Sequence, residues 1–215
     1  MKQNIFIAIF SLALCVACYA QNDTKALGLL NKASAAYNKA GGINAGFTLR
    51  ELGTGGHATN NINGTIHMKG SRFKLVVDEM TTWFDGKNQW VYIVQSKEVN
   101  VSNPTEEELL MINPVKVFQL YKHGYKCKWA GEKNEGGRTV QKVMLTPINK
   151  FSSLQSIIAS FDKTTLRPVS IVITNKDKSG SRISISTYVT GQTYSDTHFI
   201  FQQKNYPNTE VIDLR

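Results

Sequence analysis

Residues 81–94 read Thr-Thr-Trp-Phe-Asp-Gly-Lys-Asn-Gln-Trp-Val-Tyr-Ile-Val, and this stretch decides the fold. Asp85-Gly86 lies between two runs of strand-forming residues, which is a strong hairpin signal because glycine reaches positive φ without steric cost. Side chains alternate between the two faces of a strand. On the second arm one face therefore carries Trp90, Tyr92 and Val94, and the other carries Val91 and Ile93. Since both faces are apolar, we expect each side of the sheet to be covered.

The same alternating pattern recurs on both sides of this hairpin. Apolar residues alternate with others between residues 45 and 101 and again between 125 and 188, separated by turns rich in Gly, Asn and Asp. Short strands with turns between them are typical of an antiparallel meander. The pattern predicts about eleven strands, the last of them a short strand at Phe199-Ile200-Phe201.

Three helical segments are predicted. Asp23 or Thr24 caps a helix that runs to about Lys39 and packs on the sheet as a lid. Two short central helices open at Asn103-Pro104 and at Asn113-Pro114, because proline suits the first helical position. Glu106, Glu107 and Glu108 follow the first of these prolines. We interpret them as a charge cluster at a helix start rather than a metal or acid–base site, because consecutive helical positions do not converge on one point.

Residues 1–20 have the pattern of a secretory signal peptide. Lys2 is followed by an apolar run that is short for a membrane span, and Ala20 precedes the expected cleavage site. An alternative is lipidation at Cys18, because Cys15-Val16-Ala17-Cys18 loosely resembles a bacterial lipobox. The mature chain would be a single domain over residues 21–215, periplasmic and either soluble or lipid-anchored.

The charge and cysteine content limit the classes of partner. The formal net charge is +9, but the lysines are scattered singly, so nucleic acid is not an expected partner. A solvated basic face is the first interpretation, and an approach to anionic lipid headgroups is the second. Cys127 is the only cysteine after the signal, which excludes an intramolecular disulfide. Its alternation with Tyr125 and Trp129 favours a buried strand residue over a reactive thiol.

No catalytic or metal-binding motif is present in the sequence. His57, His67, His123 and His198 stand alone, without a second ligand at metal-binding spacing. There is no nucleophile elbow, phosphate-binding loop or dinucleotide fingerprint. We expect neither a cofactor nor an enzymatic activity. Two apolar sheet faces instead suggest a concave apolar pocket, with a plainly packed core as the alternative.

Taken together, the sequence resembles the LolA family of periplasmic lipoprotein carriers. Residues 84–92, Phe-Asp-Gly-Lys-Asn-Gln-Trp-Val-Tyr, are similar to the family's Ser-Asp-Gly-Lys-x-Leu-Trp-x-Tyr hairpin. Further similarities lie at residues 47–48, 64–69, 73–75, 145–147 and 164–168. The ending Val211-Ile212-Asp213-Leu214-Arg215 resembles Bacteroidetes-type members.

The resemblance implies a mainly β fold with α elements. This fold is an unclosed antiparallel half-barrel with a helical lid over a hydrophobic cavity. The implied function is to receive acylated lipoproteins from an inner-membrane lipoprotein-releasing transporter and to pass them to an outer-membrane acceptor, as a monomer. A lipid-anchored acceptor or an envelope-stress sensor on the same fold is the alternative, and an exported hydrolase is a third hypothesis.

The resemblance also implies the site, although alternation alone does not decide which face points inward. The expected cavity and lid residues are Phe47, Leu49, Ile66, Met68, Phe73, Leu75, Trp83, Trp90, Tyr92, Met111 and Phe118. In proteobacterial members an arginine before the hairpin holds the lid closed. Gly70 occupies that position here, and Arg72 is the nearest candidate for gating.

Overall fold

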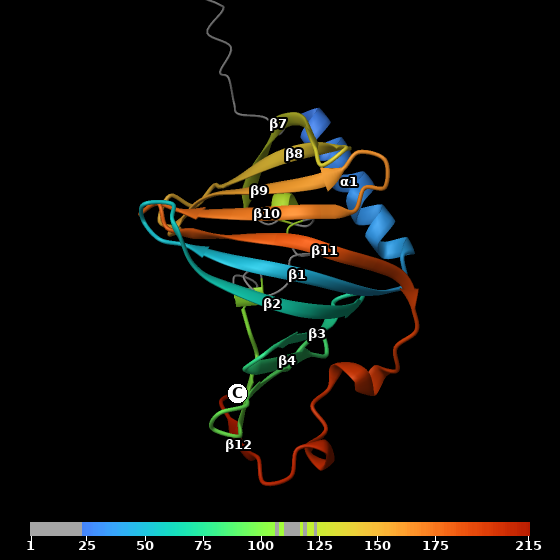
Figure 1. Cartoon of the computed structure of the whole chain (residues 1–215), viewed down its shortest axis with the longest axis vertical. Helices are drawn as coiled ribbons and strands as arrows, with labels where there is room; N and C mark the ends of the chain where they lie inside the picture. Colours follow the sequence, from blue (N-terminus) through green and yellow to red (C-terminus); the bar gives the residue numbers. More distant parts are fainter. Residues whose placement is uncertain (1–22, 106–107, 110–116, 118–119, 123) are drawn as a thin grey trace, which may run out of the picture.

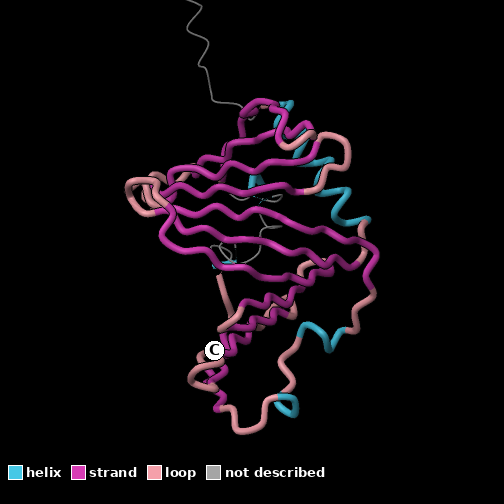
Figure 2. The backbone as a smooth tube through the Cα atoms, viewed as in Figure 1, coloured by secondary structure: helices cyan, strands magenta, loops and turns pink. Residues whose placement is uncertain are grey.

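A single β-sheet dominates the computed structural model, which describes residues 23–105, 108–109, 117, 120–122 and 124–215. Twelve strands of the described part follow one another in the order β12-β6-β5-β4-β3-β2-β1-β11-β10-β9-β8-β7. Figures 1 and 2 show this sheet as a twisted wall with helix α1 along one side. The described helices and strands are α1 (Thr24–Lys39), β1 (Gly42–Leu52), β2 (Ala58–Lys69), β3 (Arg72–Val77), β4 (Met80–Phe84), β5 (Gln89–Ile93), β6 (Glu98–Ser102), η2 (Leu120–Lys122), β7 (Tyr125–Glu135), β8 (Arg138–Pro147), β9 (Leu154–Asp162), β10 (Pro168–Asn175), β11 (Gly180–Gln192), η3 (Asp196–Phe199), η4 (Gln203–Asn205) and β12 (Glu210–Asp213).

The sheet is unclosed because its two end strands, β7 and β12, do not pair with each other in the described structure. Strands β1–β6 form one meander and β7–β11 a second. The antiparallel pair β1–β11 joins them. The expected antiparallel half-barrel is confirmed, with one departure: β12 adds to β6 in parallel.

The hairpin of residues 81–94 forms as predicted. Trp83 pairs with Trp90 across β4 and β5. In the turn, Asp85 Oδ1 accepts hydrogen bonds from the backbone N–H groups of Lys87 at 2.8 Å and Asn88 at 2.7 Å. Gly86 has φ +108°, a conformation in which a Cβ would be strained. The positive φ that made Asp85-Gly86 a hairpin signal in the sequence is therefore the conformation that Gly86 adopts.

Helix α1 covers one end of the inner face of the sheet, the face that carries the main hydrophobic core. Asp23 caps the helix, since its Oδ1 accepts from the N–H groups of Lys25 at 2.8 Å and Ala26 at 3.2 Å. These backbone hydrogen bonds, the one from Ala26 first, lower the pKa of the Asp23 carboxyl. The buried stripe of the helix packs into the same core as β7 and β8; it consists of Ala26, Leu29, Leu30, Ala33 and Tyr37. Cys127 is buried in this core, as expected.

The predicted central helices lie mostly outside the described residues. The described residues there that have helical conformation are Glu108, Leu109, Val117 and the short η2 helix. The signal-peptide prediction and the Cys18 alternative also fall outside the described part. No helix of the described chain is long and apolar enough to cross a membrane.

The outer face of β3–β6 has its own apolar cluster, covered by the segment 194–206. Trp83 meets the rings of Phe201 and Tyr206 edge-on, at 5.5 Å between ring centroids in both cases. Tyr92 lies 4.7 Å from Tyr206. The prediction of a strand at residues 199–201 is wrong, because Phe199 ends the η3 helix and packs through its ring instead of joining a ladder.

Polar contacts hold the same segment to β2 and β3. Arg72 forms an ion pair with Asp196 at 2.7 Å. His67 Nδ1 lies 2.8 Å from His198 Nε2, and the His67 ring stacks on Tyr194. A hydrogen bond between two ring nitrogens requires that at least one of them be unprotonated. Burial first, and Lys74 second, lower the pKa of His67.

The two histidines make this attachment sensitive to pH. Burial, with His67 and Lys74, also lowers the pKa of His198 below its usual value of 6.5. A histidine whose pKa is lower in the folded than in the unfolded state stabilises the fold above the unfolded pKa. This stabilisation is lost as pH falls through the folded pKa. Two further cations lie nearby: Lys69, which binds the Tyr194 carbonyl, and Arg72, which binds Asp196. Neither can neutralise the positive charge of a protonated histidine.

We therefore expect acid to weaken the attachment of segment 194–206. Between pH 7.5 and about 5.5, just below the usual histidine pKa, the wild type should lose more free energy of unfolding than the double variant His67→Asn/His198→Gln, whose amides keep hydrogen-bonding atoms but do not titrate. Urea unfolding followed by tryptophan fluorescence measures this, because Trp83 lies under the segment. Equal pH slopes in the two proteins would contradict the assignment.

Candidate functional site: an apolar cavity on the inner face

A partly open cavity of about 470 Å³ lies on the inner face of the sheet. Its walls come from β1–β5, β10 and β11, so both meanders contribute. The apolar lining consists of Phe47, Leu49, Ile62, Ile66, Leu75, Val77, Met80, Val91, Ile173 and Ile183. The polar side chains that line it are Glu51, Thr82, Gln89, Asn175, Ser179 and Ser181.

The strand register explains why these residues converge. Leu49 of β1 lies opposite Ile62 of β2 on one side and Ile183 of β11 on the other. Directly paired residues of antiparallel strands point to the same face. The row therefore continues across the sheet, with Leu75 opposite Ile66 and Thr82 opposite Val91. The cavity wall is the inner face itself rather than a loop structure.

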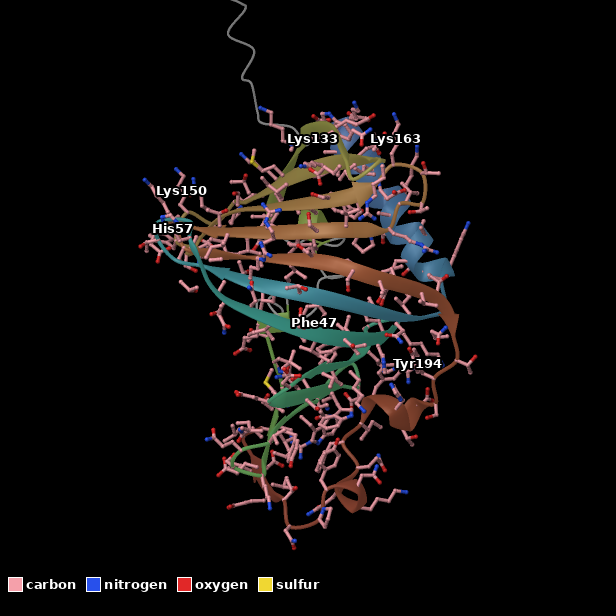
Figure 3. The ribbon with its side chains drawn as sticks, in the orientation of Figure 1. Phe47, His57, Lys133, Lys150, Lys163 and Tyr194 are labelled. Carbon is pink, nitrogen blue, oxygen red and sulfur yellow. The ribbon has the colours of Figure 1, made fainter. Side chains whose placement is uncertain are left out.

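A glycine makes room for the largest side chain in this wall. Phe47 is paired with Gly64, and a Cβ on Gly64 would lie 2.5 Å from Phe47 Cζ and 2.8 Å from the Val76 carbonyl oxygen. Any larger residue there would displace the ring. Figure 3 labels Phe47 near the middle of the sheet. The glycine of β2 thus positions the phenylalanine of β1 across the cavity wall.

One polar group in the lining has no partner in the described structure. Gln89 is buried, and its amide oxygen accepts no hydrogen bond there. A second, more polar cavity is also lined by Gln89, together with Ser102, Asn103, Glu108 and Arg215. Gln89 therefore stands between an apolar cavity and a polar one. An unpaired buried acceptor is costly, so a donor supplied by a ligand would be favoured here.

The described lining of the cavity is mainly apolar. This described lining holds one carboxylate and three hydroxyl groups, and no histidine, cysteine, lysine or arginine. Glu51 is the one side chain of this described lining that could act as a base, and no histidine or lysine lies beside its hydroxyl groups. No group of three or more histidine, cysteine or carboxylate side chains in the described chain could hold a metal ion.

The structure places the expected site residues in three groups. Phe47, Leu49, Ile66 and Leu75 line the cavity. Met68 and Phe73 lie on the same inner face but are fully enclosed in the neighbouring core. The remaining described ones, Trp83, Trp90 and Tyr92, belong to the outer face. Met111 and Phe118 lie outside the described residues.

The three aromatic residues are on the outer face because of strand parity. Thr82 and Val91 face the cavity, so their chain neighbours Trp83 and Trp90 must face the other way. Aromatic size suggests a cavity wall, but segment 194–206 supplies the cover for this face. The sequence around these aromatic residues does not indicate that a segment more than 100 residues away covers them.

Several lining residues were not among the expected ones. Val91 was missed because the expected residues of its own strand, Trp90 and Tyr92, lie on the opposite face. Ile62 could have been found from alternation, since it shares a face of β2 with Ile66. Ile173 and Ile183 could not, because their position depends on the pairing of β1 with β11. That pairing joins residues about 140 positions apart and has no local signal.

Arg72, the gating candidate, contacts the outer segment, whereas Gly70 contacts helix α1. The Arg72 side chain binds Asp196 and lies over the Phe199 ring at 5.5 Å, so it holds the outer segment. The Gly70 carbonyl accepts a hydrogen bond from the Tyr37 hydroxyl at 2.7 Å. In this structure, helix α1 is thus tied to the β2–β3 turn through backbone rather than through an arginine.

Solved structures share this architecture at low sequence identity. An uncharacterised conserved protein from Thermus thermophilus matches with a TM-score of 0.61 and 10% identity over 88% of this chain and 99% of that one. A DUF1329 family protein from Desulfovibrio piger matches with a TM-score of 0.52 and 13% identity, over 86% and 99% of the two chains. A domain assigned as an outer-membrane lipoprotein-sorting protein from Vibrio parahaemolyticus matches with a TM-score of 0.50 and 10% identity, over 84% and 97%.

Two comparisons used the sequence alone. No curated protein matches it. The family model described as "Outer membrane lipoprotein carrier protein LolA" matches residues 16–181, which is most of the chain. With the unclosed sheet and the apolar inner cavity, this match shows that the chain belongs to the LolA family of outer-membrane lipoprotein carrier proteins.

Proposed function

We propose that this protein is a periplasmic carrier that binds the acyl chains of lipoproteins in the inner-face cavity and takes them from the inner to the outer membrane. The observation that carries the proposal is an apolar cavity of about 470 Å³ on the open face of a LolA-family sheet. This volume lies within the range of about 300–1,000 Å³ typical of sites for small ligands.

The energetics of such binding follow from the lining. Each methylene moved from water into an apolar site contributes about 0.8 kcal/mol. A few methylenes therefore give substantial affinity without any covalent chemistry. Release requires something else to cover the same apolar surface, which a membrane or an acceptor protein provides. In the proposed cycle an inner-membrane transporter loads the cavity and an outer-membrane acceptor empties it.

The first test is native mass spectrometry of the protein purified from its own periplasm without detergent. A bound species with the mass of a lipoprotein or a diacyl lipid supports the carrier. A protein that is empty and does not bind added lipoprotein or hydrophobic dyes would contradict the proposal. The same spectra give the mass of the mature chain, which distinguishes cleavage after Ala20 from lipidation at Cys18.

Filling the cavity should weaken lipid binding without unfolding the protein. In Leu49→Trp the indole would occupy the space between Ile62 and Ile183. Excluding only two methylenes costs about 1.6 kcal/mol, so affinity for a fluorescent fatty acid should fall at least about tenfold. Val189→Trp, at an exposed position of β11, is the matched control and should bind normally. Unchanged affinity in a folded Leu49→Trp protein would exclude this cavity as the site.

Gln89 gives a second and more specific prediction. Gln89→Leu removes an unpaired buried acceptor, so the empty protein should become more stable. The same variant should bind an N-acyl amino acid, which has an amide N–H, about two- to tenfold more weakly, corresponding to one hydrogen bond of about 0.5–1.5 kcal/mol. Binding of a fatty acid methyl ester, which has no donor, should not weaken. Equal losses for both ligands would show that Gln89 does not contact the cargo's polar group.

A further inference from the structure

Three turns gather at one edge of the sheet, next to one end of the cavity. They connect β1 to β2 (residues 53–57), β8 to β9 (residues 148–153) and β10 to β11 (residues 176–179). The strand register places them side by side, since Leu154 pairs with Asn175 and Gly180 pairs with Leu52. Figures 1 and 2 show these turns together on the left, and Figure 3 labels His57 and Lys150 there. We call these three turns the loop edge.

The loop edge exposes a large apolar side chain. Phe151 is 95% exposed, and Ile148, three residues earlier in the same turn, is 55% exposed. Single exposed apolar residues are ordinary, but a phenylalanine almost wholly in water beside a second apolar residue is unusual for a soluble surface. Phe151 is the most exposed large apolar side chain in the part of the chain that the structure describes.

Local hydrogen bonds hold this turn in place. Asn149 Oδ1 accepts from the Phe151 N–H at 2.9 Å, and the Asn149 carbonyl accepts from the Ser152 N–H at 3.2 Å. Such an asparagine turn fixes the backbone on both sides of Phe151. The turn is also tied to its neighbour, because the Lys176 N–H donates to the Ser153 carbonyl at 2.9 Å. The exposed ring is therefore presented from a defined backbone.

Three lysines lie in the turn of the exposed pair and in the turn next to it. Lys150 belongs to the same turn, and Lys176 and Lys178 belong to the neighbouring one; all three are exposed. The acid among these turn residues, Asp177, accepts hydrogen bonds from the Ser179 hydroxyl and N–H. The Lys176 ammonium donates to the Lys150 carbonyl oxygen, so this hydrogen bond leaves the positive charge of Lys176 unneutralised. The loop edge is thus apolar at its tip and cationic around it.

We propose that the loop edge is a docking surface for an anionic lipid bilayer. Phe151 and Ile148 enter the boundary between headgroups and acyl chains, and Lys150, Lys176 and Lys178 bind anionic headgroups. An apolar tip with lysines beside it is the combination that attaches peripheral proteins to such surfaces, since neither part alone binds firmly. The formal net charge, +9 for the whole sequence and +8 without Lys2 of the expected signal, adds long-range attraction to the same surface.

The position of the loop edge connects docking to the cavity. Asn175 and Ser179 flank the turn that is bonded to Ser153, and both line the cavity. A bilayer at the loop edge would lie next to that end of the cavity. The transfer of cargo at this contact rests on the proposed function, whereas the docking rests on the loop edge itself.

Vesicle co-sedimentation tests the docking. The mature protein, purified without detergent, is mixed with vesicles of phosphatidylethanolamine and phosphatidylglycerol, and separately with vesicles of phosphatidylcholine alone. We expect binding to the anionic vesicles that weakens with added salt, and at least fivefold less binding to the neutral ones. Phe151→Ser should reduce binding to anionic vesicles at least threefold, and Lys150→Glu/Lys178→Glu at least fivefold.

The matched control changes the same charge elsewhere. Lys133 and Lys163 lie away from the loop edge, as Figure 3 shows, so Lys133→Glu/Lys163→Glu should stay within twofold of wild type. An equal loss in this control would mean that net charge alone drives adsorption and would overturn the proposal. No wild-type binding to anionic vesicles would overturn it too, and would leave a protein partner as the occupant of the loop edge.

Dye binding to the cavity, measured on the same samples, separates the two proposals. The loop-edge variants should bind dye as wild type does, and Leu49→Trp should lose dye but keep vesicle binding. Vesicle binding without dye binding in the wild type would retain the docking and remove the carrier. Dye binding without vesicle binding would retain the cavity as a binding site and remove the docking.

Discussion

The antiparallel pairing of β1 with β11 is the contact on which the rest of the structure depends. It joins two meanders, β1–β6 and β7–β11, that are each continuous in the chain. Without it, the two halves would each expose an edge and neither would form a cavity wall. Phe47 and Leu49 of β1 then meet Ile185 and Ile183 of β11 on one face. The binding surface is therefore created by a long-range pairing and not by either half alone.

The parts of the fold that could be predicted are those with local physical causes. The turn at Asp85-Gly86 and the helix cap at Asp23 depend on a few neighbouring atoms, and both are where the sequence places them. The position of Trp83 could not be predicted in this way. Alternation assigns it to the face opposite Thr82, but which face is concave depends on the twist of the whole sheet.

The same limit explains which cavity residues were found. Phe47, Leu49, Ile66 and Leu75 belong to strands consecutive in sequence, where resemblance and alternation act together. Ile173 and Ile183 arrive from the second meander. Gln89 was overlooked for a different reason: a polar residue in a strand is usually read as solvent-exposed, whereas here it is buried with its amide oxygen unpaired.

The two faces of the sheet solve the burial problem of the central hairpin in different ways. On the outer face, segment 194–206 belongs to the same chain and covers Trp83 and Tyr92 with aromatic rings. On the inner face, α1 packs against β7 and β8, and described residues of β1–β5 line a cavity. The outer cover is covalently part of the chain, whereas in the proposed function an acyl chain bound in the inner cavity can dissociate. Because segment 194–206 already packs on Trp83 and Tyr92, a ligand that entered or left the inner cavity would change the exposure of one face only. Under the proposed function, this division would let the sheet keep its shape while its apolar inner surface is alternately filled and emptied.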